Sequence, residues 1–137
     1  MADEAVLIHE LEPPIPFTCA DGTGIEKGAI LEISDPMTVA TTNGDSDKII
    51  GIAAAEKIAS DGQTKIPVYL RGVFKFTAGA GGITVGRAFR TDTATGSANE
   101  VVIAAANEEG IIGTALETAT DRQTFLGLLN PINPVLA

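Results

Sequence analysis

Alternating apolar and polar positions dominate this chain of 137 residues and predict short β-strands. The clearest run is "KIPVYLRGVFKFTA" (residues 65–78), which is rich in the Val, Tyr and Phe that favour pleated strands. Within it Gly72 interrupts the register and predicts a bulge or a sharp bend. Two shorter strands, "AILEI" (29–33) and "RAFRT" (87–91), each follow a glycine that is typical of a tight turn. The pattern therefore predicts a mainly β domain of many short strands.

Two alanine-rich segments leave the assignment open between helix and strand. "IAAAEKIAS" (52–60) and "VVIAAANEE" (101–109) have helical propensity, but strand patterns flank both. Two polar segments, "SDGQT" (60–64) and "ATDRQT" (119–124), predict hairpin turns, because Asp and Gly tolerate the positive φ angles of short connections.

Two blocks of the chain resemble each other and indicate an internal duplication. "GIEKGAILEISDP" (24–36) resembles "GITVGRAFRTDTA" (82–94), and Ile-Ile-Gly follows in both blocks. We expect two quasi-repeats, at about 24–77 and 82–130, that pack about a pseudo-two-fold axis and close one small barrel-like core. The alternative is chance similarity among short strands rich in Gly, Ile and Ala.

Both ends of the chain differ from the middle because prolines stiffen them. "EPPIPFTCADGTG" and "NPINPVLA" favour an extended backbone that cannot donate a regular hydrogen-bond ladder. We therefore expect an extended N-terminal arm (1–23), a β-rich domain (24–130) and a C-terminal tail (131–137), with both arms outside the core.

Size and charge narrow the class of protein. A mass of 14.1 kDa suits one domain that buries a core without metals or disulfides, and a single cysteine, Cys19, rules out an internal disulfide. The net charge of −9 opposes binding to nucleic acid or to an anionic membrane surface. No apolar run reaches the ~20 residues that span a bilayer. The acidic N-terminus does not have the pattern of a signal peptide.

Catalytic motifs are incomplete. "ADGTG" (20–24) resembles half of an aspartic protease site, but "AGAGG" (78–82) in the second repeat has no acid, and such catalysis needs two carboxylates. His9 and Cys19 have neither a triad context nor the spacing of metal ligands, so Cys19 is interpreted as an incidental thiol.

The remaining acidic residues give little indication of a binding site. Asp45 and Asp47 form at most a weak surface cation site, and Glu56 and Glu117 recur in the two repeats as ordinary solvent-facing glutamates. We expect no enzyme activity, no cofactor and no metal.

The order of four segments resembles a known family. "GIEKGAILEIS", "KIIGIAAAEKIASDGQTKIPVYLRGVFKF", "GGITVGRAFRTDT" and "GIIGTALETATDRQTFLGLLN" together resemble the head-decoration, or capsid cement, proteins of tailed bacteriophages. The resemblance implies a β-tulip-like fold similar to that of the phage lambda decoration protein. It also implies a homotrimer, made in the host cytoplasm, that binds the major capsid protein on the outer surface of the virion and locks capsomers together.

The N-terminal arm supplies the expected contacts in this interpretation. It would add a strand to an exposed edge of the capsid while apolar side chains fill pockets. The residues expected to do so are Val6, Ile8, Ile15, Pro16 and Phe17.

Two other functions remain open at this stage. The first is a carbohydrate or host-surface binding module on a virion, which the absence of Trp and the presence of one Tyr and five Phe disfavour. The second is a biotinyl- or lipoyl-type carrier domain, with Lys57 as the modified lysine.

Overall fold

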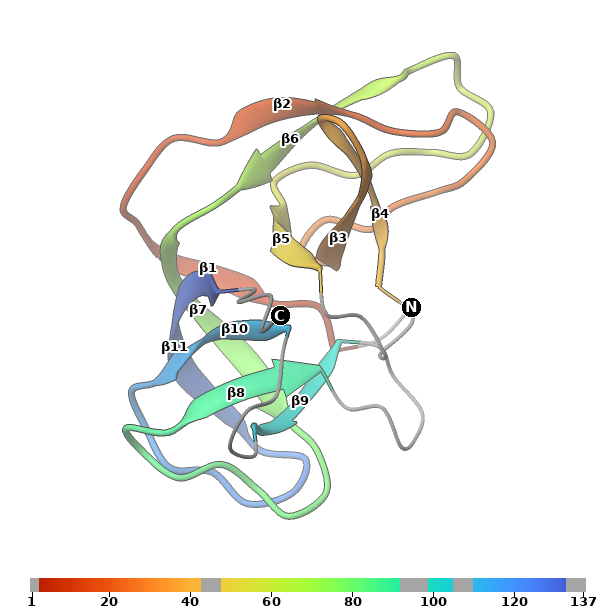
Figure 1. Ribbon diagram of the computed structural model, residues 1–137. Coiled ribbons are helices and arrows are strands. Elements are labelled where there is room, and N and C mark those ends of the chain that lie inside the picture. The colour runs from red at the N-terminus through yellow and green to blue at the C-terminus, as the bar shows by residue number, and fades with distance from the viewer. Residues whose placement is uncertain (1–2, 43–47, 92–98, 105–109, 133–137) are drawn as a thin grey trace, which may run out of the picture.

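The computed structural model describes residues 3–42, 48–91, 99–104 and 110–132, and these residues form strands and turns without a helix (Figure 1). The expectation of a mainly β, barrel-like domain is confirmed. No helix in this part of the chain is long and apolar enough to cross a membrane. The strands are β1 (Val6–Glu10), β2 (Ile15–Thr18), β3 (Ile30–Asp35), β4 (Thr38–Thr41), β5 (Ile49–Ala53), β6 (Lys65–Tyr69), β7 (Gly72–Ala78), β8 (Ala88–Thr91), β9 (Glu100–Ile103), β10 (Ile111–Ala115) and β11 (Thr124–Ile132).

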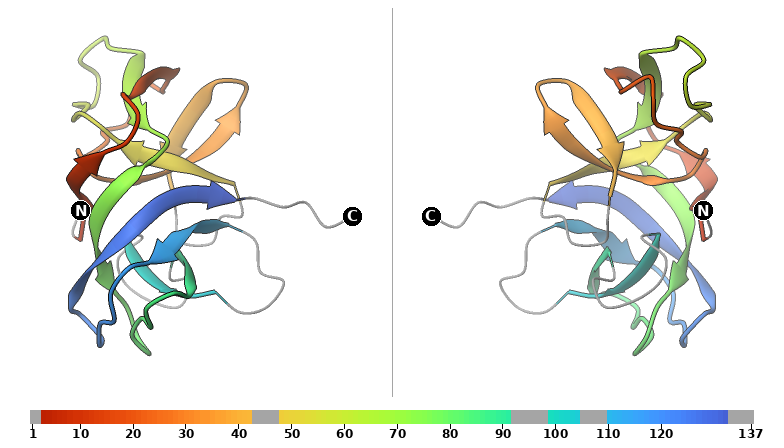
Figure 2. Two further views of the ribbon diagram at one scale, coloured as in Figure 1. Left: turned by 90° about the vertical axis from the view of Figure 1, so that its left-hand side faces the viewer. Right: turned by 90° about the vertical axis from the view of Figure 1, so that its right-hand side faces the viewer.

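The strands close two small barrels. The first barrel has the order β2-β4-β3-β5-β6, and the second has β7-β11-β10-β8-β9, closed by the pairing of β7 with β9. Figure 1 places the first barrel above the second, and the turned views of Figure 2 agree. Each repeat therefore closes its own barrel, and the expected single shared barrel is wrong.

The same topology occurs twice. In each barrel the first strand is antiparallel to the last and parallel to the third: β2 with β6 and β4, and β7 with β11 and β9. An isolated bridge also recurs, Ile25 with Lys57 and Ile83 with Ala119. The sequence repeat thus has a counterpart in the hydrogen bonds of the backbone.

The repeats begin one strand earlier than the expected boundaries. β7 opens the second barrel instead of ending the first repeat, and β2, expected in the arm, opens the first barrel. The pairing of Phe17 with Ile66 corresponds to that of Phe76 with Phe125. The short "FT" that both opening strands share was too weak a signal to reveal this relationship.

The N-terminal segment is not an arm outside the core. β1 pairs with β7, and β2 pairs with β6 and β4. The expectation failed because burial of an apolar side chain from each strand, Leu7 and Phe17, favours docking over a solvated extended chain. At the other end β11 runs to Ile132, and residues 133–137 lie outside the described part.

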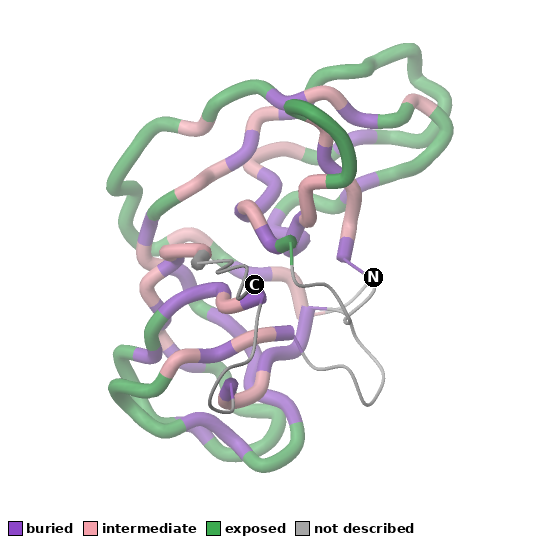
Figure 3. The backbone as a smooth tube through the Cα atoms, in the orientation of Figure 1, coloured by how far each residue is buried: buried purple, intermediate pink, exposed green. Residues whose placement is uncertain are grey.

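One of the two hydrophobic clusters is shared between the barrels. The first barrel encloses its own cluster around Phe17, Leu31 and Ile66. The larger cluster combines residues of the second barrel with residues of the first, and Figure 3 shows buried positions where the two barrels meet. The residues that face across are Ile30, Ile49 and Ile52. Their counterparts in the second barrel, Ala88, Ile111 and Thr114, are half-buried or exposed. The packing between the barrels is therefore unsymmetrical.

The repeated Ile-Ile-Gly has a packing explanation. A Cβ on Gly51 would collide with the carbonyl oxygen of Tyr69, and one on Gly113 with that of Leu128. Both carbonyls belong to the last strand of the respective barrel. Glycine is needed twice because the same close backbone approach occurs twice.

The two ambiguous segments are not helical where they are described. Their first residues belong to β5 and β9, and residues 105–109 lie outside the described part. The expected bend beside Gly72 occurs at residues 70–71, between β6 and β7. In the two hairpins Gly62 has the expected positive φ (85°), but Ser60 and Arg122 take positive φ in place of the aspartates.

Candidate interaction surface

β1 connects the two barrels. It pairs with β7 of the second barrel, while the N–H of Ala5, just before it, donates to the carbonyl of Gly28 in the first barrel at 2.9 Å. Ala5 is buried, and Leu7 packs against the shared core. We call residues 5–10 the clasp, because they hold both barrels.

Apolar side chains on and next to the clasp face solvent. Val6 is 57% exposed, Ile8 42% and Ile15 38%, and Pro16 is also exposed. Leu11, which the sequence analysis did not single out, is 53% exposed and lies between them in the chain. Its position in the same apolar segment, "VLIHEL", was the signal available for it.

Phe17 is a correction to the expected contact residues. It is 3% exposed and belongs to the core cluster of the first barrel, so in this fold it cannot enter a pocket on another protein. Ile15 precedes it by two residues on the same strand, but lies at the strand's first position, where the side chain reaches solvent.

The clasp has an irregular edge. The register between β1 and β7 shifts between Leu7 and His9, so that Ile8 is an extra residue in the ladder. A bulge of this kind bends a strand and hinders regular pairing along its outer edge. The clasp therefore presents side chains to a partner better than it presents a backbone ladder.

Charged residues lie next to the apolar side chains of the clasp. Glu10 forms a hydrogen bond with Tyr69. The pKa of the Tyr69 hydroxyl is raised mainly by burial, and further by the charge of Glu10 and by this hydrogen bond. Asp3, Glu4 and Glu12 flank the same segment. The exposed apolar side chains of the clasp thus lie among charges of both signs, because the exposed Lys75 is the cross-strand partner of Val6.

Lys57 is not available for modification. Its ammonium is fully buried and donates to Asp61 Oδ1 at 2.8 Å, to Asp21 Oδ1 at 3.3 Å, and to the carbonyls of Ile58 (2.8 Å) and Asp21 (2.9 Å). A carrier lysine must reach solvent at the tip of a turn, so this geometry overturns the carrier interpretation. The lysine instead ties together the loops of the first barrel.

The pKa values in this network follow from its contacts. Burial lowers the pKa of Lys57, but the hydrogen bonds and charges of Asp61 and Asp21 outweigh it, and the net shift is upward. The hydrogen bond from Lys57, together with the backbone N–H of Gln63, lowers the pKa of Asp61. The counterpart of Lys57 in the second barrel is Ala119, so only one repeat has this network.

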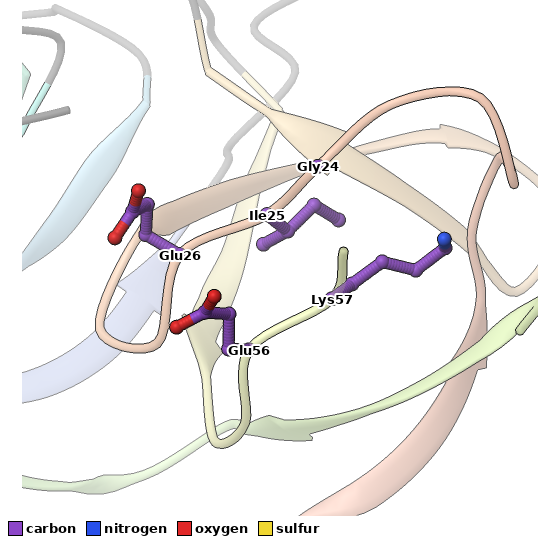
Figure 4. A pocket seen from close by; sticks show the side chains of 5 residues that line it. All are labelled: Gly24, Ile25, Glu26, Glu56 and Lys57. Carbon is purple, nitrogen blue, oxygen red and sulfur yellow. The ribbon is translucent and has the colours of Figure 1, made fainter. Parts of the chain in front are cut away.

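A cavity of about 220 Å³ lies beside this network. Figure 4 shows that the Lys57 side chain points away from the two glutamates at the cavity, Glu26 and Glu56; Gly24 and Ile25 complete the lining. Both glutamates are exposed. In the second barrel Glu117 accepts a hydrogen bond from the N–H of Leu126 at 2.9 Å, which is a structural role.

The other candidate residues do not come together. Cys19 is buried, and burial raises the pKa of its thiol, whereas His9 is exposed on the clasp. Within the described residues no three His, Cys, Asp or Glu side chains form a group that could hold a metal. Asp45 and Asp47 lie outside the described residues.

A solved structure shares this fold. The chain is similar to the N base of the head fiber protein gp8.5 of bacteriophage phi29, with a TM-score of 0.55 and 16% sequence identity over 89% of this chain and 98% of that chain. No curated protein matches the sequence. The family model of phage cement proteins matches residues 9–129.

These observations define a small β protein, without a helix in the described residues, that exposes several apolar side chains near its N-terminus. The chain belongs to the phage cement protein family. It is therefore a capsid-associated structural protein of a phage virion, as the resemblance in the sequence implied.

Proposed function

We propose that this protein binds the outer surface of an icosahedral phage capsid, through the major capsid protein, and stabilises it by bridging capsomers. The observation that carries the proposal is the group of exposed apolar side chains on and beside the clasp, in a chain of the cement family. The protein would be made in the host cytoplasm and would bind as a homotrimer at local three-fold positions. Its likeness to the phage lambda decoration protein, including a β-tulip form, stays a prediction.

The proposed contact residues are Val6, Ile8, Ile15 and Pro16, together with Leu11. A capsid pocket lined by apolar groups would match these side chains. Each copy binds weakly through so few side chains. A trimer that presents three such surfaces to a lattice gains about a hundredfold or more in avidity.

Co-sedimentation with expanded, undecorated phage capsids tests this proposal. The variant Val6→Ser/Ile8→Ser/Ile15→Ser should weaken binding at least tenfold, about 1.4 kcal/mol. The matched control is Ile58→Ser/Val85→Ser, which removes side chains that are 64% and 54% exposed elsewhere on the surface. Wild-type binding by the first variant, or an equal loss in the control, would contradict the assignment of the surface.

The carbohydrate or host-surface module is the other candidate function. Sugar sites usually stack a sugar ring on an exposed aromatic side chain. Every Phe in this chain is buried and Tyr69 is half-buried, and all six aromatic residues lie in the described part. The arrangement of aromatic residues therefore favours the cement function.

A further inference from the structure

The duplicated fold contains a second edge of the kind that binds the clasp. In the second barrel, the opening strand β7 pairs with β9 at Thr77 and, earlier along the same edge, with β1 at Val73 and Lys75. In the first barrel, the opening strand β2 pairs with β4 only at Thr18. None of the described strands pairs with this edge before Thr18, and Figure 1 shows β2 at the top of the first barrel, far from the second.

The direction of the backbone N–H groups identifies the residues on this edge. The N–H of Thr18 points towards β4, since it donates to the carbonyl of Met37 at 2.7 Å, and that of Cys19 points the other way, to Thr64 at 2.9 Å. Successive N–H groups of a strand point to opposite edges. Positions 16 and 14 therefore face the open edge, and both are proline.

The second barrel has residues with an N–H at the equivalent positions. Because Phe17 corresponds to Phe76, Pro16 corresponds to Lys75 and Pro14 to Val73. Lys75 pairs with Val6 of the clasp and Val73 pairs with His9. Proline cannot donate to a ladder, so the first barrel lacks both donors that its duplicate uses to hold β1.

We propose that the edge of β2 is a latent binding site for the clasp strand of a second copy of this protein, and that Pro14 and Pro16 keep it closed. The occupant is identified by the fold itself, because the duplicated edge already binds this strand within the chain. To reach the edge of β2, the clasp strand of the second copy would leave its own β7, as in a strand exchange. Edge strands commonly carry prolines that prevent pairing between molecules. Copies held side by side on a capsid are at high effective concentration, where an open edge would join them into chains.

The test is the solution mass of Pro14→Val/Pro16→Lys, which gives the first barrel the residues of the second. By sedimentation velocity, the mass of this variant should rise with concentration above that of the wild type. Excess peptide of residues 4–11, "EAVLIHEL", should reverse the rise, and a scrambled peptide should not. The control is Pro13→Val, which adds an N–H on the side of the strand that faces β6.

A folded double variant that keeps the wild-type mass over the whole concentration range would overturn the proposal. Equal association of the Pro13→Val control would do the same, because the effect would then not depend on the edge. If the double variant fails to melt cooperatively, Pro16→Lys alone is titrated into the fluorescently labelled peptide. Saturable binding that the wild type lacks would support the proposal, and anisotropy equal to that of the wild type would overturn it.

Discussion

Replacing Gly28 by alanine is the sharpest test of the clasp. Gly28 has a φ of +90°, and a Cβ there would overlap the carbonyl oxygen of Ala5 and lie 3.0 Å from the Cβ of Glu4. Gly86 occupies the equivalent turn of the second barrel with a φ of +84°, and a Cβ there would meet nothing within 4 Å. Gly86→Ala is therefore a matched control that shares the backbone strain and lacks the collision.

The expected difference in the free energy of unfolding follows from these contacts. Left-handed backbone costs either alanine about 1–2 kcal/mol. Only Gly28→Ala displaces Ala5, whose N–H bond to residue 28 contributes about 0.5–1.5 kcal/mol. If the clasp detaches and Leu7 leaves the core, the loss of stability grows by up to about 1.5–3 kcal/mol. We expect Gly28→Ala to be about 1–4 kcal/mol less stable than Gly86→Ala, or several degrees in Tm.

Urea unfolding of both variants measures this difference, and hydrogen exchange locates it. The amides of residues 6–10 should lose protection in Gly28→Ala and keep it in Gly86→Ala. Equal destabilisation of the two variants, with β1 equally protected in both, would refute the idea that close contact at Gly28 holds the clasp.

Two further predictions concern the interior of the barrels. Gly51→Ala and Gly113→Ala should each destabilise the protein by about 3 kcal/mol, the upper end of overpacking effects, because the added methyl group meets a backbone carbonyl. Denaturant unfolding measures this change. A loss of stability below about 1 kcal/mol would contradict the close packing. The Lys57 network should make stability depend on pH. Because the pKa of Asp61 is lowered in the fold, Asp61 stabilises the protein above its ordinary pKa of 3.8, and this stabilisation is lost as the pH falls into acid. Because the pKa of Lys57 is raised, Lys57 stabilises the protein below its ordinary pKa of 10.5, and this stabilisation is lost in strong base. In Asp61→Asn the fall of Tm with acid should be shallower than in the wild type, and an unchanged slope would count against the network.

The strands were predictable because their cause is local. Alternation along residues 65–78 and the glycine turns before residues 29–33 and 87–91 place side chains on faces, and the structure has strands in all three places. The sequence also revealed the repeated Ile-Ile-Gly. It could not reveal the reason for the glycine, which is a carbonyl from a strand more than ten residues away.

The N-terminal segment was misjudged for a physical reason. Prolines restrict the backbone locally, and the prediction of an arm followed from that restriction alone. Whether such a segment docks depends on nonlocal contacts, here the pairing of β1 with β7 and the burial of Phe17. The sequence pattern could not show that Phe17 is buried while Ile15 and Pro16, next to it, are exposed.

Because the barrels pack unsymmetrically, the second barrel does not repeat the apolar face by which the first barrel packs. The first unit packs Ile52 against the second, and the second unit has Thr114 at the equivalent, exposed position. Head-to-tail stacking of identical units has no internal reason to stop, and repeat proteins end such arrays with a polar terminal unit. The second barrel therefore lacks an apolar side chain that the first uses to pack against its neighbour, and a third unit would find a less apolar face to stack on.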